Sequence, residues 1–282
     1  MMTVATIADA VKSAELTLKP HSESPRLDAE LLLATLLGLP RSALIARGNE
    51  PVALLDESAY AELIAKRARG VPIAYLTGSR EFWSLPLKVS PAVLVPRPET
   101  EVLVEHALAL WPRDAHCSVL DLGTGSGAIA LSLAHDRPRW AITGVDISSA
   151  ALEVAALNAQ NLKLSHVKWR LGSWFAPVTG ERFHLIVANP PYIAAKDPAL
   201  TALGAEPAAA LVAGPTGLEA LCAIIAQAPK HLHACGWLAL EHGAAQAHDV
   251  ARLLMQHGFD SIRTYSDFSG RPRVTLGVHT QH

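Results

Sequence analysis

The chain is poor in the features that mark secreted, metal-binding and membrane proteins. Its 282 residues include three cysteines, Cys117, Cys222 and Cys235, which lie far apart without paired spacing. This argues against a disulfide framework or a cysteine-based zinc site, and we interpret all three as free thiols. No stretch approaches eighteen apolar residues, and the N-terminus has no apolar core behind a basic start. We therefore expect no membrane span, no signal peptide and a cytoplasmic location.

An excess of charge of either sign is also missing. The chain has 24 Lys and Arg against 26 Asp and Glu, a formal net charge of −2. An overall basic surface for nucleic acid is therefore not indicated, although a local basic patch is compatible with these totals. Thirteen histidines are present, and His231 and His233 form the densest group. No carboxylate or third ligand stands at a metal-binding spacing from them, so we predict no metal site.

The first eighty residues are predicted to be helical. Apolar residues recur at helical spacing in the first segment, at Val4, Ile7, Ala8 and Val11. Ser24 before Pro25 is typical of a helix start, and a basic turn followed by Gly70 is typical of a helix end. We predict a small helical bundle domain over residues 1–80.

Prolines interrupt the next segment, FWSLPLKVSPAVLVPRP, which runs from Phe82 to Pro98 and is otherwise rich in β-forming residues. Prolines at such intervals suit short edge strands and not a helix. We predict a β-hairpin linker over residues 81–98. The stretch ETEVLVEHALALWP then returns to a helical pattern and leads into a second domain over residues 99–282.

From Ser118 onward, short apolar runs alternate with helical patterns. Seven runs are typical of strands: SVLDLG, AITGVDIS, HVKWRLG, FHLIVANPPY, GWLALEHG, DSIRTYSD and RVTLGVH. The alternation predicts an α/β fold with a seven-stranded, mostly parallel sheet covered by helices on both faces. The last two runs have no helix between them and are expected to form an antiparallel pair. The long connection after the fourth run, Ala194 to Pro215, is where a lid or substrate loop is expected.

Glycines follow the first strand of this sheet, in VLDLGTGSGAIAL. Gly123, Gly125 and Gly127 allow the backbone to turn tightly and to approach a ligand closely. The usual pyrophosphate-binding fingerprint has its third glycine one residue later. Asp121 at the strand end disfavours a pyrophosphate and favours a cationic or hydrogen-bond-donating ligand. The glycines alone fit either a nucleotide-type site or a tight turn.

Two later strands also end in residues of chemical interest. Asp146 follows the glycines by about twenty residues, where a carboxylate can accept hydrogen bonds from both ribose hydroxyls. Asp121 and Asp146 are equally suited to capping the helices that follow them. Trp174 and Phe175, after the third strand, either wall an adenine pocket or fill the core.

The stretch IVANPPYI ends the fourth strand at the carboxyl edge, where open α/β sheets bind ligands. Asn189 precedes a proline, which favours an extended backbone, and Pro190 and Pro191 contribute no N–H donors. This leaves two acceptors, the Asn189 side-chain oxygen and the Pro190 carbonyl, beside the flat ring of Tyr192. Such a set suits a planar –NH2 group, and adenine, cytosine and glutamine all remain open as substrates.

Together, DLGTGSG, Asp146 and NPPY resemble the class I S-adenosylmethionine-dependent methyltransferases that alkylate planar amino groups. The flanking stretches PIAYLTGSREFWSLPLKVSPAVLVPRPETEVLVE, EPAAALVAGPTGLEAL, LALEHG and GRPRVTLG are similar to those of the release factor glutamine methyltransferases, the HemK/PrmC family. The resemblance covers nearly the whole chain. It implies a Rossmann-like sheet, S-adenosyl-L-methionine as cofactor and, as substrate, the glutamine of the Gly-Gly-Gln motif of class 1 peptide-chain release factors.

The resemblance also implies roles for single residues. Cofactor binding is expected at Gly123, Thr124, Gly125, Ser126, Gly127, Asp146, Trp174 and Asn189. The expected catalytic residues are Asn189, Pro190 and Tyr192, and these together with Pro191 are expected to hold the substrate glutamine. The N-terminal helical domain is expected to help dock the release factor, with no direct contact to nucleic acid or membrane. Ser173 departs from the family, which often has an acid there, and this puts an additional polar contact to adenine in doubt.

Two alternatives remain open from the sequence. A nucleic-acid adenine N6-methyltransferase would use the same planar-amine chemistry, but the slightly acidic balance and the lack of a basic target-recognition domain argue against it. A non-enzymatic scaffold would bind a nucleoside without transferring a methyl group, and the intact NPPY argues against that.

Overall fold

The computed structural model describes residues 6–52 and 57–280 of the chain, which separates into two units, Met1–Ser79 and Arg80–His282. Val4 of the first expected helix lies outside the described residues, as do Leu55 and Asp56 at the start of the helical stretch LDESAYAELIAKRARG, which ends at Gly70. Within the described part, no helix combines the length and the apolar character that a membrane crossing requires.

The N-terminal unit consists of helices packed around one apolar core. They are α1 (Ile7–Leu18), α2 (Pro25–Leu37), α3 (Arg41–Ala46), α4 (Glu57–Ala68) and α5 (Ile73–Thr77). Their buried side chains form one cluster that includes Leu18, Leu33 and Ile64. The predicted helical bundle is confirmed.

Two helix starts show how the local sequence sets these elements. α1 begins after Thr6, whose hydroxyl accepts the Asp9 N–H at 3.2 Å while the Asp9 carboxylate accepts the Thr6 N–H at 3.0 Å. This reciprocal capping box satisfies two N–H groups of the first turn. Ser24 occupies the N-cap position of α2 as predicted, but its hydroxyl makes no capping bond and donates at 3.5 Å to the Asp28 carboxylate.

A two-stranded hairpin follows, made of β1 (Ser79–Phe82) and β2 (Leu85–Lys88). It is shorter than the predicted segment, because residues 89–97 form no strand. The turn residues Trp83 and Ser84 have φ angles of 52° and 59°, a left-handed conformation that non-glycine residues rarely adopt.

Contacts with the rest of the second unit hold this turn. The Trp83 backbone N–H donates to Glu101 at 2.8 Å, and its indole N–H donates to Asp136 at 2.9 Å. Two charge-assisted hydrogen bonds of this kind can offset the backbone strain of the turn.

Within the described residues, the second unit is built on the predicted seven-stranded sheet. Its strands are β3 (Ser118–Leu122), β4 (Ala141–Asp146), β5 (Lys168–Leu171), β6 (Phe183–Ala188), β7 (Leu232–Glu241), β8 (Phe259–Ser266) and β9 (Pro272–His279). The spatial order is β5-β4-β3-β6-β7-β9-β8, with parallel pairing from β5 through β7. β9 is antiparallel to β7 and to β8, so the predicted antiparallel last pair is confirmed. The alternation did not predict that β9 lies between the other two.

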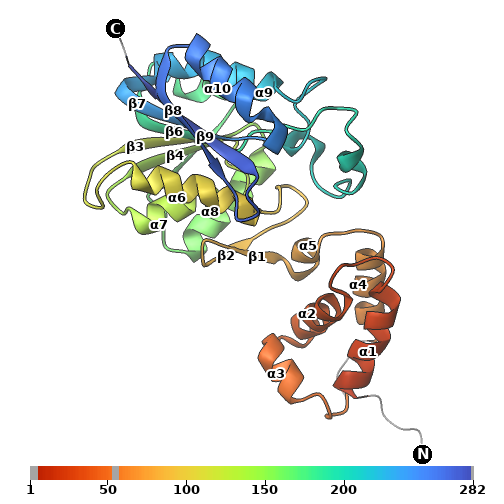
Figure 1. Ribbon diagram of the computed structural model, residues 1–282. Helices are drawn as coiled ribbons and strands as arrows, with labels where there is room; N and C mark the ends of the chain where they lie inside the picture. The colour runs from red at the N-terminus through yellow and green to blue at the C-terminus, as the bar shows by residue number, and fades with distance from the viewer. Residues whose placement is uncertain (1–5, 53–56, 281–282) are drawn as a thin grey trace, which may run out of the picture. The chain divides into compact units, whose positions relative to one another are not determined.

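Helices cover both faces of the sheet. They are α6 (Glu101–Ala109), α7 (Ala128–Asp136), α8 (Ser149–Asn161), α9 (Glu219–Gln227) and α10 (Ala247–Gln256). Short 3-10 helices connect them: η1 (Pro98–Thr100), η2 (Ala176–Val178), η3 (Pro198–Thr201), η4 (Ala208–Ala210), η5 (Ala228–His231) and η6 (Ala244–Gln246). Figure 1 shows α6, α7 and α8 on one face of the sheet and α9 and α10 on the other.

Alternation along the strands divides the core into two layers. On β3, Val119 joins the cluster shared with α6 and α7, whereas Leu120 and Leu122 join the cluster shared with α9 and α10. Phe82 of the hairpin belongs to the first cluster, so the hairpin is part of the packed second unit.

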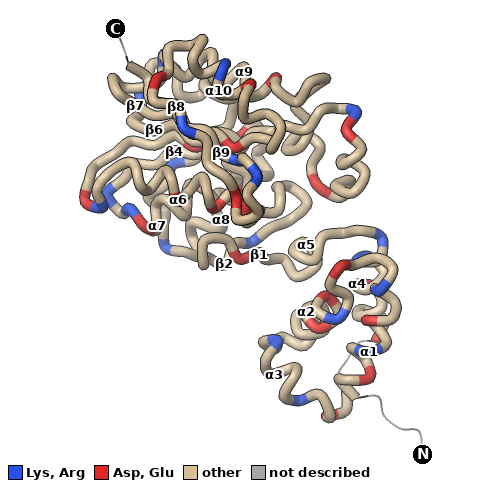
Figure 2. The backbone as a smooth tube through the Cα atoms, in the orientation of Figure 1, with Lys and Arg blue, Asp and Glu red and all other residues tan. Residues whose placement is uncertain are grey.

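The strand order places the candidate residues together. After β3 the chain builds β4 and β5 on one side, and then crosses to build β6 and β7 on the other. Ligands bind at the carboxyl edge of an open sheet where the order reverses in this way. The glycines follow β3, Asp146 ends β4 and Asn189 follows β6, so all three lie at this edge. Figure 2 shows basic and acidic residues interspersed along both units.

Candidate active site

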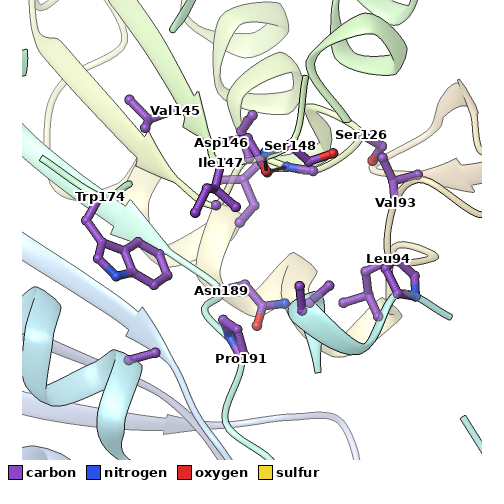
Figure 3. Close-up of a pocket in the computed structure, with 18 of the residues that line it drawn as sticks. Val93, Leu94, Ser126, Val145, Asp146, Ile147, Ser148, Trp174, Asn189 and Pro191 are labelled. Atoms are coloured by element: carbon purple, nitrogen blue, oxygen red, sulfur yellow. Dashed lines mark hydrogen bonds between the residues drawn. The ribbon is translucent and has the colours of Figure 1, made fainter. Parts of the chain in front are cut away.

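A cavity of about 560 Å³ opens at the carboxyl edge of the sheet. Its walls come from residues 93–100 before α6, the turn after β3 with the start of α7, the segments that end β4 and follow β5, residues 189–213 after β6, and the first half of α9. Figure 3 shows Asp146 and Ser126 on one side of this opening, and Asn189 and Pro191 on another. The cavity therefore joins six separate segments of the sequence.

The glycine loop, residues 123–127, forms the first wall. Gly123, Gly125 and Gly127 have φ angles of 71°, 56° and 81°, in the left-handed region that favours glycine. Gly123 and Gly125 line the cavity. A Cβ atom on Gly127 would lie 3.0 Å from Leu131 and 3.1 Å from Trp169, so this third glycine permits close packing beneath the loop.

A buried asparagine holds the loop from behind. The Asn158 side-chain amide on α8 donates to the Ser126 carbonyl at 2.9 Å and to the Lys88 carbonyl at 3.0 Å, and it accepts the Lys88 N–H at 2.7 Å. One residue thus connects β2 of the hairpin to the glycine loop.

Asp121 lies fully buried beneath the loop. Its Oδ2 accepts the Thr124 hydroxyl at 2.6 Å and the Ala130 N–H at 3.2 Å, so it caps α7 as one of the sequence interpretations allowed. Its Oδ1 has no hydrogen-bond partner among the described residues. Burial raises the pKa of Asp121 to about 7, against the effect of these two hydrogen bonds. A buried acceptor with an unused oxygen suits a ligand that donates a hydrogen bond.

Asp146 lines the cavity at the end of β4. Its Oδ2 accepts the Gly125 N–H at 2.9 Å, and its Oδ1 accepts the Ser148 N–H at 2.9 Å. The carboxylate therefore fixes the glycine loop and the start of α8 together, and each oxygen retains a lone pair for a ligand hydroxyl.

The two aromatic residues after β5 have different positions. Trp174, which has a φ of 45°, lines the cavity. Phe175 is 2% exposed, belongs to the core beside α9 and stacks on His231 with ring centroids 4.5 Å apart. The sequence left open whether these aromatic residues wall a pocket or fill the core. In the structure Trp174 lies in the pocket wall and Phe175 lies in the core.

The segment Asn189–Tyr192, the NPPY segment, forms the opposite wall. The Asn189 side-chain N–H donates to the Thr100 hydroxyl at 3.1 Å, and no described residue donates to its Oδ1. Asn189 and Pro191 line the cavity, whereas Pro190 is buried and does not. No described residue donates a hydrogen bond to the Pro190 carbonyl.

Tyr192 lies outside the cavity lining, packed against the core beside α9. Its hydroxyl donates to Glu241 at 3.4 Å, and its carbonyl accepts the Gln246 side-chain N–H at 3.1 Å. Burial raises the pKa of Tyr192, so the phenol is neutral. The Tyr192 ring, which was expected to stack on the substrate, therefore lies outside the cavity and supports the NPPY segment from the core side.

The long loop after β6 is pinned to the segment before α6. Glu206, whose side chain is 2% exposed, accepts the Val95 N–H at 3.0 Å and pairs with Arg97. Pro207 and Arg97 both line the cavity. This contact holds the loop as a wall of the site.

Replacing Glu206 with Ala is expected to loosen this wall. The Val95 N–H and the Arg97 guanidinium would lose their acceptor, and we expect a loss of about 1–3 kcal/mol in the free energy of unfolding, because Arg97 is partly solvated. Thermal unfolding measures this loss. Glu50→Ala is a matched control, since its pair with Arg47 is exposed on both sides, and an equal effect of the two variants would contradict the pinning role.

Sequence reasoning assigned no site role to Thr100, Glu206 or Glu241. Each acts on a residue about 50 to 110 positions away, so local patterns could not show the partner. In the sequence, Glu241 stands out only as a carboxylate at the end of the apolar stretch in LALEHG, and the structure then shows that it is 1% exposed.

The two histidines of the densest group, His231 and His233, pack against other rings. His233 lies against His184 with ring centroids 4.5 Å apart, and His231 stacks on Phe175. Within residues 6–52 and 57–280, no group of three or more His, Cys, Asp and Glu side chains is arranged to hold a metal ion.

Comparisons with known proteins agree with this geometry. Residues 9–78 match the family model described as the PrmC N-terminal domain, and residues 98–215 match the methyltransferase small domain. The chain is 49% identical over 260 residues to the release factor glutamine methyltransferase of Yersinia pestis, covering 91% of this chain and 93% of that protein. It is 48% identical over 254 residues to that of Xylella fastidiosa, covering 89% and 92%. A solved Pyrococcus furiosus methyltransferase shares the fold, with a TM-score of 0.54 and 18% identity over 70% of this chain and 90% of that one.

This chain is a methyltransferase. Its fold, the cavity at the sheet edge where the strand order reverses, and the matched methyltransferase model all agree on this class. The identity and coverage shared with the curated relatives narrow this further. The chain belongs to the release factor glutamine methyltransferase family, as the sequence resemblance implied.

Proposed function

We propose that this protein transfers a methyl group from S-adenosyl-L-methionine to the side-chain nitrogen N5 of a glutamine, the one in the Gly-Gly-Gln motif of class 1 peptide-chain release factors. The observation that carries this proposal is the hydrogen bonding of the Asn189 side-chain amide, which lies at the cavity wall. Its N–H is taken up by Thr100, and its Oδ1 has no donor among the described residues at the cavity wall. A fixed amide oxygen at this place can accept one N–H of a planar amide.

The residues of the first wall fit the proposed cofactor. Asp146 offers carboxylate lone pairs for the ribose hydroxyls, and Trp174 offers an aromatic wall for adenine. The unused Asp121 Oδ1 lies buried beneath the loop and outside the cavity lining, and it would accept from an ammonium-bearing ligand through water. Thr124, Ser126 and the loop glycines complete this wall. When bound, S-adenosylmethionine supplies a methyl group on a positively charged sulfonium.

The residues of the NPPY segment act on the substrate nitrogen. A glutamine amide nitrogen is a poor nucleophile because its lone pair is delocalised into the carbonyl. Asn189 Oδ1 would accept from the –NH2 group and stabilise the positive charge that grows on nitrogen as it forms the new N–C bond. The Pro190 carbonyl stays a predicted second acceptor, although Pro190 is not among the residues that line the cavity. Correct positioning alone can lower the barrier by several kcal/mol, up to about 7–11 in the best cases.

Loss of a proton from the substrate nitrogen needs no strong base. The nitrogen would gain the methyl group as the C–S bond of the donor breaks, and one N–H proton would then pass to water or to a backbone oxygen. Pro191 and Tyr192 contribute rigidity, the first at the cavity wall and the second from below.

We further propose a division of labour along the chain. Residues 1–80 would dock the release factor and residues 99–282 would carry out catalysis. Residues 81–98 would link these parts, and they also pack on the catalytic unit and line the cavity. Release factors act in translation, and a cytoplasmic location follows from such a substrate. The family model matched by residues 9–78 supports a role specific to this family.

Methyl transfer from labelled S-adenosylmethionine tests the function. We expect label on a class 1 release factor, no label when the Gly-Gly-Gln glutamine is replaced, and no label on DNA or RNA. The glutamine-replaced factor is the matched control, since it keeps every other docking contact. Equal labelling of the two factors, or label on DNA or RNA alone, would contradict the proposal.

A further inference from the structure

Phe268 is an aromatic residue that the fold leaves in solvent. It lies in the turn between β8 and β9, the segment Asp267–Arg271, and it is 88% exposed. This is the highest fraction among the large apolar residues that are exposed in the described part of the chain. A single exposed apolar residue is ordinary on a protein surface. Phe268 differs from such residues in how its turn is held and in where that turn lies.

Asp267 holds the turn in one conformation. Its buried carboxylate accepts two backbone N–H groups, those of Ser269 at 2.9 Å and Arg271 at 3.0 Å. It also pairs with the Arg273 guanidinium at 3.0 Å, and the Asp267 N–H donates to the Arg271 carbonyl at 2.8 Å. A side chain on a backbone fixed in this way loses little conformational freedom when a partner covers it. The turn therefore presents the Phe268 ring as a preorganised contact.

The strand register places this turn at the edge of the sheet that carries the cavity. Val274, near the start of β9, pairs with Glu241 at the end of β7. Leu240, the residue before Glu241, pairs with Ala188 at the end of β6, and the NPPY segment begins at the next residue. β9 is two strands away from β6, which is about 10 Å across the sheet. The turn thus lies on the side of the NPPY segment, away from the ends of β4 and β5.

A protein substrate would cover a turn at this distance. In the proposed function the target nitrogen belongs to a folded protein, so the body of that protein lies over the opening while the glutamine reaches in. A standard protein interface buries about 800 Å² on each partner, which corresponds to a patch roughly 30 Å across. Such a patch, centred on the NPPY segment, extends roughly 15 Å in each direction and reaches a turn two strands away.

We propose that the turn Asp267–Arg271 is a docking element for the class 1 release factor, in which Phe268 packs against an apolar recess of that protein. Aromatic residues and Arg are enriched in protein interfaces, and Arg271 is exposed in the same turn. The proposal rests on the proposed function of the site. It gives Phe268 a role in binding the protein substrate and no role in the methyl-transfer step.

Replacing Phe268 tests this role through the affinity for the release factor. In assays with labelled S-adenosylmethionine, Phe268→Ala is expected to raise KM for the release factor about tenfold, as truncation of a well-packed interface residue does, with kcat within about twofold of wild type. Phe268→Leu keeps a large apolar side chain and should retain most of the affinity. The affinity of all three proteins for S-adenosylmethionine, measured by calorimetry, should be the same.

Met255→Ala is the matched control. Met255 is also a large apolar residue, 62% exposed, but it lies in the last turn of α10, which leads to the opposite edge of the sheet, where β8 begins. The substitution should leave KM for the release factor at the wild-type value. Neither exposed side chain should affect the melting temperature. A rise in KM of the same size in Met255→Ala and Phe268→Ala would contradict a specific contact at the turn.

A second measurement does not depend on turnover. Fluorescence anisotropy of a labelled release factor, titrated with enzyme in the absence of cofactor, gives the dissociation constant of the complex. We expect it to be about tenfold higher for Phe268→Ala than for wild type and for Met255→Ala.

The outcomes are distinct. If the wild type methylates no release factor, the proposed function fails, whereas the binding titration still tests the turn. If the wild type is active, and Phe268→Ala keeps both the wild-type KM and the wild-type dissociation constant, the docking role is wrong and the proposed function stands. A wild-type dimer in sedimentation analysis that becomes a monomer in Phe268→Ala would assign the residue to a contact between two copies of this chain, and would also overturn the proposal.

Discussion

Replacing Asn189 with Ala is expected to lower the rate of methyl transfer about 100- to 1,000-fold, the usual cost of losing one preorganised group that stabilises transition-state charge. The side chain lines the cavity and offers an oxygen that no described residue occupies. Its removal leaves the growing charge on the substrate nitrogen with one acceptor fewer. Single-turnover assays with labelled S-adenosylmethionine measure the rate of the chemical step.

Cofactor binding should change far less than the rate, because the glycine loop and Asp146 are untouched. Calorimetric titration with S-adenosylmethionine measures this affinity. Asn161→Ala, at the exposed end of α8, is the control and should behave as wild type. An Asn189→Ala variant with a near-normal rate would remove the basis of the proposed mechanism.

The second large effect is expected from Gly144→Ala on β4. A Cβ atom there would lie 2.5 Å and 2.7 Å from two ring atoms of Trp169, and 2.9 Å from the Thr124 hydroxyl. These contacts are too short, and the ring is rigid. Overpacking of this kind costs about 1–3 kcal/mol, which corresponds to a fall in melting temperature of roughly 3–10 °C for a domain of this size.

The same substitution should also weaken cofactor binding. Thr124 belongs to the glycine loop and donates to Asp121, so displacing it disturbs the loop and the acid beneath it. Gly204→Ala is the control, because its nearest neighbour would be an ordinary 3.6 Å away. A Gly144→Ala protein that melts with the wild type and binds S-adenosylmethionine equally well would show that this packing has no influence on the loop.

The sequence predicted the elements of the sheet well, because its strands and helices differ in local periodicity. It did not predict the position of β9 between β7 and β8, since pairing depends on contacts between distant segments. The short hairpin shows the same limit. Prolines predicted interrupted strands, but only packing decides that pairing ends at Lys88.

For the candidate site too, the sequence predicted the position of some residues and not of others. The chain order alone brought Gly123, Asp146 and Asn189 to one edge of the sheet, and the structure places all three on the cavity. Their roles in binding and catalysis remain predictions. Tyr192 was expected to face the substrate, yet its hydroxyl reaches Glu241, which lies 49 positions further along the chain. Local sequence does not reveal such a partner.

The bond network of Asn158 has a consequence for where the protein can be shortened. It joins Lys88 to the glycine loop, and Phe82, Leu85 and Leu87 fill the core beneath α6 and α7. A truncated chain that starts at residue 99 would lose these contacts. The hairpin is an internal brace of the catalytic unit, so a minimal methyltransferase should begin no later than Ser79.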